Sequence, residues 1–180
     1  MSEVVKTRVD FTGETAAKLL GILSGDNPVG KSLRPLFRRA FATGETDLET
    51  LGWMFEYIPK EIAGKAGYMS YEEKAIYLML CIFAECRGKG ISGISLFSAA
   101  AEADIPQRRL FELESVNSLE ELRMPLCMLV KSIIAQRNSI NYVELAKDLA
   151  LFQYNKDRLI RKWARQYASQ KYKTNKGDQL

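Results

Sequence analysis

The segment Asn155-Lys-Asp-Arg-Leu-Ile-Arg-Lys-Trp-Ala-Arg-Gln-Tyr-Ala168, close to the C-terminus, has a clear amphipathic pattern. On a helix of about 100° per residue, its apolar and basic side chains fall on opposite faces. The segment therefore predicts a helix that buries a face anchored by a tryptophan and presents four cations outward. The apolar face is Leu159, Ile160, Trp163, Ala164 and Tyr167, and the basic face is Arg158, Arg161, Lys162 and Arg165.

The positive charge of the chain is concentrated in and after this segment. Residues 156–176 hold eight basic side chains and one acid, a local charge of +7, whereas the rest of the chain sums to −3. A basic stripe on one helix is typical of proteins that contact phosphate groups. Residues 171–180, which include Lys171, Lys173 and Lys176, are expected to form a flexible basic tail.

Helix signals recur along the rest of the chain, and no segment alternates with period two for long enough to predict a sheet. Four expected N-cap residues each have an acid three residues later, a pattern that satisfies the first amides of a helix. These pairs are Thr46 with Glu49, Ser70 with Glu73, Ser118 with Glu121, and Asn141 with Glu144. Helices are predicted near residues 14–24, 32–43, 47–57, 71–87, 94–103, 106–115, 119–137, 142–153 and 156–170.

These elements predict an all-α protein, a compact bundle of about eight or nine helices without a β-sheet. Its length suits a single helical domain over residues 1–170. An alternative division has an N-terminal half over 1–115 and a C-terminal half over 118–170. No apolar run reaches the roughly 18 residues of a membrane span, and no secretory signal is evident, so we expect a cytoplasmic protein without a membrane partner.

The composition argues against catalysis. The chain contains no histidine, which removes the usual general base and the commonest zinc ligand. Three cysteines, Cys81, Cys86 and Cys127, lie in apolar surroundings without a CxxC spacing, so they are predicted to be reduced core thiols. We expect a protein that is not an enzyme and that holds no cofactor or metal ion.

One motif, in contrast, is typical of nucleotide-binding enzymes. The stretch Gly25-Asp-Asn-Pro-Val-Gly-Lys-Ser32 matches the phosphate-binding loop pattern GxxxxGK[ST]. That loop follows a buried strand, whereas residues 14–23 have the apolar spacing of an amphipathic helix. A magnesium-binding aspartate after a hydrophobic strand is also missing. A connection between helices is therefore the preferred interpretation, and a small NTPase using Lys31 and Ser32 is kept as an alternative.

Further basic residues recur on the predicted helices. Their faces carry few acids, which favours contact with a nucleic-acid backbone rather than recognition of bases. Lys31, Arg34 and Arg38 share one face after the glycine-rich loop. Two further basic sites follow: Arg108 with Arg109, and Arg123 with Lys131 and Arg137.

The order of several motifs resembles the CasB-type small subunit of the type I-E CRISPR Cascade complex. The resemblance covers roughly residues 30–168 and is most specific in the last 50 residues. Where that family usually has a tryptophan shortly after the Asp-Leu pair at 148–149, this chain has Phe152. The motifs are Ser32–Ala40, Trp53, Gln107–Phe111, Glu121–Leu126, Ile140–Leu149 and Arg161–Tyr167.

The resemblance implies a non-catalytic, all-helical subunit of an RNA-guided surveillance complex. Its implied partners are the CRISPR guide RNA, the target DNA, the backbone and large subunits of Cascade, and a second copy of itself. Carried over by position, the resemblance assigns Trp53, Leu149 and Trp163 to the core or an interface. It assigns phosphate contact to Arg34, Arg38, Arg108, Arg109, Arg123, Arg161 and Arg165. A helical adaptor whose basic helix docks on another protein is the second alternative.

Overall fold

The computed structural model describes residues 2–65 and 67–177, with side chains up to residue 174. Within these residues every regular element is a helix, and the one pairing of β type is an isolated parallel bridge between Ile91 and Ile140. The prediction of an all-α bundle of about eight helices is therefore confirmed. The helices are α1 (Glu3–Ser24), α2 (Pro28–Thr43), α3 (Leu48–Phe55), α4 (Tyr71–Glu85), α5 (Leu96–Glu102), α6 (Arg108–Glu114), α7 (Leu119–Ala135) and α8 (Tyr142–Gly177).

Three helices are longer than predicted, and one of them is α2, which begins at Pro28 rather than near residue 32. Helix α1 begins at Glu3 rather than near residue 14, because Val9 and Gly13 are buried and its N-terminal turns pack on other helices. Gly13 allows a close approach, since a Cβ there would lie 2.8 Å from Cδ of Lys147 on α8. Helix α8 continues through residues 171–177 of the expected tail, and residues 178–180 lie outside the described part of the chain.

Most of the predicted N-caps are found. Ser70 and Glu73 form a reciprocal capping box, and Ser118 accepts a hydrogen bond from the amide of Glu121. Asn141 accepts one from the amide of Glu144 in the same way. The prediction that Thr46 is an N-cap was wrong. Asp47 caps α3 instead, because its carboxylate accepts from the amides of Glu49 and Thr50.

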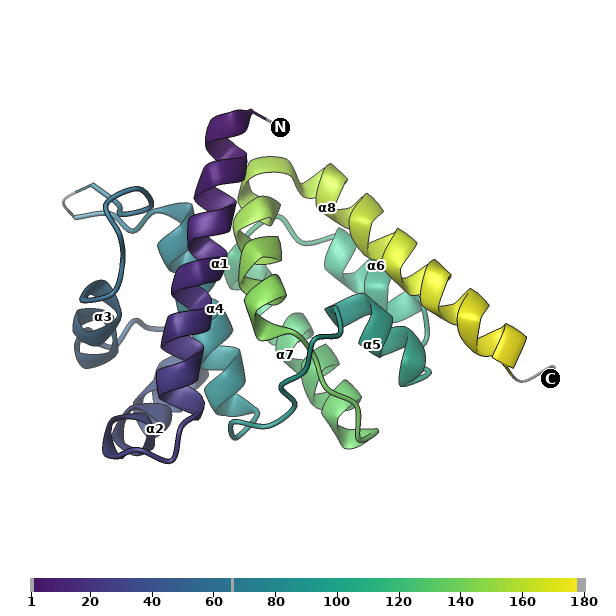
Figure 1. Ribbon diagram of the computed structural model, residues 1–180, viewed down its shortest axis with the longest axis horizontal. Coiled ribbons are helices and arrows are strands. Elements are labelled where there is room, and N and C mark those ends of the chain that lie inside the picture. Colours follow the sequence, from purple (N-terminus) through teal and green to yellow (C-terminus); the bar gives the residue numbers. More distant parts are fainter. Residues whose placement is uncertain (1, 66, 178–180) are drawn as a thin grey trace.

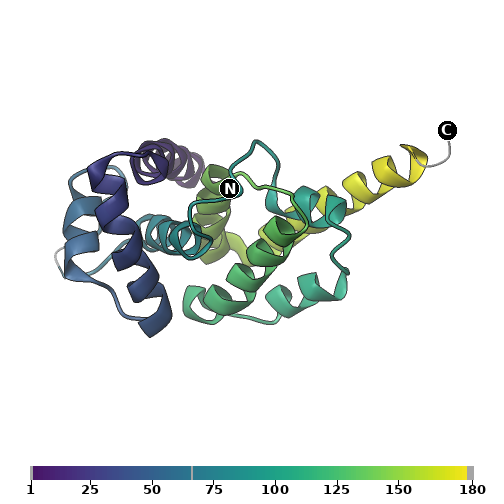
Figure 2. The same cartoon turned by 90° about the horizontal axis from the view of Figure 1, so that it is seen from below.

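Helix α4 lies at the centre of the molecule. From Glu72 to Ala84 every side chain except Lys74 is buried, as expected of a helix that is apolar on nearly all sides. Helices α1, α2, α7 and α8 pack against it from different directions. Figures 1 and 2 show this arrangement, with α2 and α3 at one end of the molecule and the C-terminal part of α8 extending from the other.

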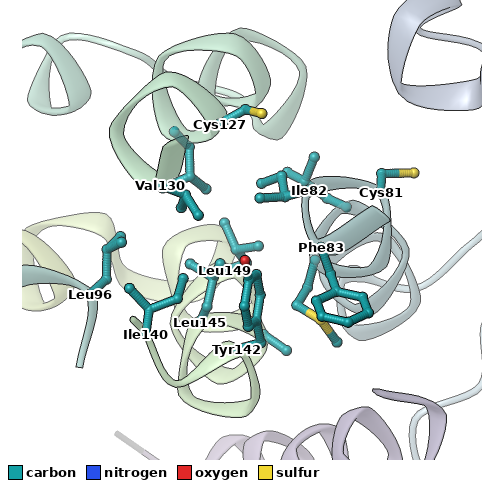
Figure 3. Packing of buried hydrophobic residues seen from close by; sticks show 14 of the residues in the cluster. Cys81, Ile82, Phe83, Leu96, Cys127, Val130, Ile140, Tyr142, Leu145 and Leu149 are labelled. Carbon is teal, nitrogen blue, oxygen red and sulfur yellow. The ribbon is translucent and has the colours of Figure 1, made fainter. Parts of the chain in front are cut away.

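The core between α4, α7 and the first part of α8 is closely packed. Figure 3 shows Phe83 of α4 facing Tyr142 of α8. The two ring centroids are 5.2 Å apart at an interplanar angle of 81°, the edge-to-face geometry favoured by aromatic pairs. The hydroxyl of Tyr142 donates to the carbonyl of Lys89, so this buried polar group is satisfied. Burial raises the pKa of the Cys81 thiol, in the same core, to about 12.

A buried ionic group joins three helices at the N-terminal end of α4. The carboxylate of Glu72 is fully buried and accepts from Arg8 of α1 at 2.7 and 2.8 Å and from the Tyr154 hydroxyl of α8 at 2.6 Å. Burial alone would raise the pKa of Glu72. The hydrogen bonds from Arg8 and Tyr154 outweigh that effect, so the pKa of Glu72 lies below its ordinary value.

Replacing Glu72 with glutamine is expected to lower the free energy of unfolding by about 3 kcal/mol, because Arg8 loses its charged partner while it remains partly buried. A carboxylate whose pKa is lowered in the folded state stabilises the protein above its unfolded pKa of about 4.3. This contribution is lost as the pH falls through the folded-state pKa. Urea unfolding between about pH 3 and pH 7 should show an acid-dependent loss that is smaller in Glu72→Gln.

The matched control is Glu112→Gln, which removes an exposed partner of Arg109. Exposed ion pairs contribute about 0–1 kcal/mol, so this variant should unfold like the wild type. Equal stability of Glu72→Gln and Glu112→Gln would show that the buried group does not stabilise the fold.

Candidate nucleic-acid interface

Helix α8 consists of two helical parts joined by a sharp bend at Asn155. The backbone there has φ −160° and ψ 79°, which are not helical angles. The Asn155 side chain accepts from the amide of Arg158 at 3.0 Å, so it acts as the N-cap of the second part. The two predicted helices, 142–153 and 156–170, therefore correspond to the two parts, which diverge from the bend (Figure 1).

An open hollow lies beside this bend and is lined by four basic residues of the second part. The exposed side chains of Arg158, Arg161 and Arg165 line it. No described carboxylate lies within 4.0 Å of these three guanidinium groups, and the Arg161 guanidinium donates to the backbone carbonyl of Asp157. The arginines are therefore available to bind an external anion. The other lining residues are Leu151, Asn155, Lys162 and Gln166.

Lys162 does not point outward as the helical pattern predicted. Its ammonium lies 2.8 Å from a carboxylate oxygen of Glu144 and 2.6 Å from one of Asp148, both on the first part of α8. The reason is the bend, which folds that acidic face toward Lys162. Loss of hydration disfavours the charged lysine, but the two carboxylates outweigh this and raise the pKa of Lys162.

A second basic cluster forms where α2, α4 and α7 meet. Arg38 of α2 and Lys131 of α7 both approach Glu85, at 3.8 and 2.6 Å. Arg34, which is half-buried, lies beside Gly88, where an added Cβ would be 3.7 Å from its Nη1. The structure thus brings together three predicted residues from two helices distant in sequence. Arg87 and Lys89 flank Gly88 in the sequence and are exposed. They were not predicted, because a loop has no helical period from which its position on the surface could be inferred.

Comparison with known proteins agrees with this architecture. The family model of CRISPR-associated protein Cse2 matches residues 36–167. The chain belongs to this family. Its model covers all three arginines of the hollow, whereas the glycine-rich stretch 25–32 lies outside the match. No curated protein sequence is significantly similar to the chain.

Two solved structures share the fold of this Cse2-family chain. The crystal structure of CasB from Thermobifida fusca superposes with a TM-score of 0.65 at 16% identity, covering 89% of this chain and 97% of that one. CasB from Thermus thermophilus gives a TM-score of 0.60 at 19% identity, covering 94% and 99% of the two chains. The predicted resemblance to the CasB type is confirmed, and family membership supports a role as a structural subunit of the CRISPR Cascade complex.

The remaining predicted cations are dispersed over the Cse2-family fold. Lys31 pairs with Asp26 at 2.8 Å, and Arg109 pairs with Glu112 at 3.6 Å, both on exposed surfaces. Arg108 is exposed at the start of α6. Arg123 is directed inward: its Nη1 donates to the carbonyl of Phe41, and its guanidinium lies 5.3 Å from the centre of that ring. Arg123 thus satisfies a carbonyl near the end of α2.

The geometry around residues 25–32 differs from that of a phosphate-binding loop. Helix α1 occupies residues 3–24, where such a loop requires a strand. Asn27 caps α2 by accepting from the amide of Gly30 at 2.7 Å, so this amide is already used within the protein. Residues 25–27 connect two helices as predicted, and residues 28–32 form the first turns of α2.

The described residues contain no group of three or more His, Cys, Asp or Glu side chains that could hold a metal ion. No described helix is long and apolar enough to cross a membrane. Lys171 of the expected tail forms an ion pair with Asp104, which attaches the last turns of α8 to the loop after α5.

Proposed function

We propose that this Cse2-family chain binds the nucleic acid of the Cascade complex through phosphate contacts made by the hollow beside the bend of α8. The observation that carries the proposal is the row of three exposed arginines, Arg158, Arg161 and Arg165, without a described carboxylate partner. Arginine presents several donors in a planar fork that suits phosphate oxygens. In an RNA-guided system, base pairing with the guide supplies sequence information, so the protein needs only backbone contacts.

The proposed ligands are the guide RNA and the target DNA of the R-loop. The spacing of the arginines fits about two phosphates, because seven residues of helix rise about 10 Å. The second cluster, formed by Arg34, Arg38 and Lys131, is proposed as an additional contact. Its two cations at Glu85 are partly neutralised, so we expect it to contribute less than the hollow.

The same proposal assigns a structural role within the complex. The chain is proposed to contact the backbone and large subunits and a second copy of itself, and to have no catalytic activity. Lys162 and Arg123, which were predicted as phosphate ligands, are already held by groups of this chain and are not assigned a direct contact. Lys31, Arg108 and Arg109 remain proposed peripheral contacts.

Binding of the purified chain to labelled single strands of different sequence tests this proposal. We expect equal affinity for oligo-dT, a mixed DNA sequence and the corresponding RNA, within about threefold, because phosphate contacts carry no base information. Fluorescence anisotropy measures the affinities. A strong preference for one sequence, or no binding to any strand at low salt, would contradict the proposal; the latter result would favour the protein-docking adaptor.

The NTPase alternative has its own test. We expect Lys31→Ala to leave the fold unchanged, since Lys31 is exposed and pairs only with Asp26. Titration of ATP or GTP with magnesium should give no heat of binding with the wild type or with the variant. Binding by the wild type that the variant loses would establish a nucleotide site at residues 25–32.

A further inference from the structure

We infer that Asp148 is a positioning residue for the arginines of the hollow, an inference that rests on the proposed function. Asp148 lies on the first part of α8 and is 3% exposed. Its two carboxylate oxygens bind different residues of the second part: Oδ1 accepts from Lys162 at 2.6 Å and Oδ2 from the Trp163 indole at 2.7 Å. One buried side chain therefore spans the bend of α8.

These contacts belong to a small cluster that we call the clasp, formed by Glu144, Asp148, Lys162, Trp163 and Gln166. Glu144 accepts from Lys162 at 2.8 Å and from Gln166 at 3.1 Å. Two acids one helical turn apart thus make four contacts with three residues of the second part. The clasp joins two of the stretches that carry the resemblance to CasB, residues 140–149 and 161–167.

The clasp fixes the rotation of the second part about its own axis. Lys162 and Trp163 are neighbours in sequence, so they point about 100° apart on the helix. Because Asp148 binds both, turning the helix in either direction would break one of the two contacts. Arg158, Arg161 and Arg165 lie on the same helix, and their directions into the hollow are set by the same rotation.

A fixed direction favours binding, because less freedom is lost when phosphates are bound. The backbone at Asn155 cannot supply this rigidity, since the helical hydrogen-bond ladder is interrupted there. The stacking of Trp163 on Phe97 of α5, with ring centroids 4.5 Å apart, holds the second part to the bundle. The clasp relates it directly to the first part, which forms the other wall of the hollow.

The substitution Asp148→Asn separates two explanations, because an effect of charge and an effect on arginine positioning would change DNA affinity in opposite directions. Lys162 and Trp163 bind different oxygens of Asp148, and asparagine replaces one of these oxygens with an NH₂ group, so one of the two donors would face another donor. The variant is also more positive by one charge, beside a site proposed to bind phosphate. If charge alone matters, Asp148→Asn should bind single-stranded DNA more tightly; if Asp148 positions the arginines, binding should weaken by about fivefold.

The matched control is Asp10→Asn, which makes the same charge change at an exposed ion pair with Lys147. It should bind oligo-dT as tightly as the wild type or slightly more tightly. Hydrogen exchange gives a second readout: in Asp148→Asn, amides of residues 156–167 should exchange faster, while those of α4 keep their rates. Weaker binding with this local change supports the inference, and binding equal to or tighter than that of Asp10→Asn overturns it.

A second variant decides the matter if Asp148→Asn unfolds. Trp163→Phe keeps every charge and an aromatic ring against Phe97 but removes the donor to Asp148. It should bind oligo-dT about twofold to threefold more weakly, and unchanged affinity with unchanged exchange over residues 156–167 would overturn the inference. The proposed function is tested separately: if charge reversal of Arg158, Arg161 and Arg165 leaves affinity unchanged, the hollow itself is not the binding site.

Discussion

Replacement of Trp163 with alanine is expected to lower the free energy of unfolding by about 3–5 kcal/mol. Trp163 is 2% exposed, stacks on Phe97 at an interplanar angle of 26°, and donates its indole N–H to the buried carboxylate of Asp148. The variant loses the buried area and the stack, and it leaves one oxygen of Asp148 without a partner. The first loss weakens the contact between α5 and α8, and the second weakens the contact between the two parts of α8.

Thermal unfolding monitored by circular dichroism measures this effect. For a protein of this size, such a loss corresponds to a decrease in Tm of about 10 °C. Trp53→Ala is the matched control, because Trp53 is half-buried and its indole N–H has no hydrogen-bond partner among the described residues. We expect a loss of about 2 kcal/mol for the control. A Trp163→Ala protein with an unchanged Tm would show that the α5–α8 contact does not stabilise the fold.

Reversing the charge of Arg158, Arg161 and Arg165 to glutamate is expected to weaken binding of single-stranded DNA or RNA by about 25-fold or more. Each phosphate contact on a single strand contributes about fivefold in affinity at 0.1 M salt, and two contacts fit along this stripe. Repulsion by the new carboxylates adds to the loss. The fold should be retained, since the three side chains are exposed and form no ion pair with a described residue.

The control for this variant is Lys18→Glu, Lys60→Glu and Lys65→Glu. It makes the same change in net charge at exposed residues on α1 and on the loop between α3 and α4. That loop lies at the end of the molecule opposite the C-terminal part of α8 (Figure 1). Equal losses of affinity in the two variants would show that only the overall charge matters and that the hollow is not a specific site.

Much of the fold could be predicted from the sequence, because helical period and capping signals are local. The separation of the last two helices at Asn155 and the burial of Trp163 both follow from the pattern of neighbouring residues. The partner of Trp163 could not be predicted in this way. The structure places Phe97 of α5 against its ring, and Asp148 on the first part of α8 accepts from its indole N–H.

For the basic residues of the candidate site, too, the sequence predicts the helix on which each lies but not its partners within the fold. A helical projection assigns Arg161 and Lys162 to the same outward face, since it treats the helix in isolation. The bend brings Glu144 and Asp148 onto Lys162 and leaves Arg161 exposed, a distinction that depends on how the two parts of α8 fold together. Arg123 is a similar case, because the carbonyl of Phe41 that accepts from it lies 82 positions away in sequence.

The salt dependence of binding tests the central proposal most directly. Affinity for a single-stranded oligonucleotide, measured by anisotropy between about 50 and 200 mM NaCl, gives a log–log slope of about 0.7 per neutralised phosphate. Relative to the wild type, charge reversal of Arg158, Arg161 and Arg165 should flatten that slope by about one to two units, whereas the lysine control should leave it unchanged. If the arginine variant has the wild-type slope, the hollow beside the bend of α8 does not contact phosphate.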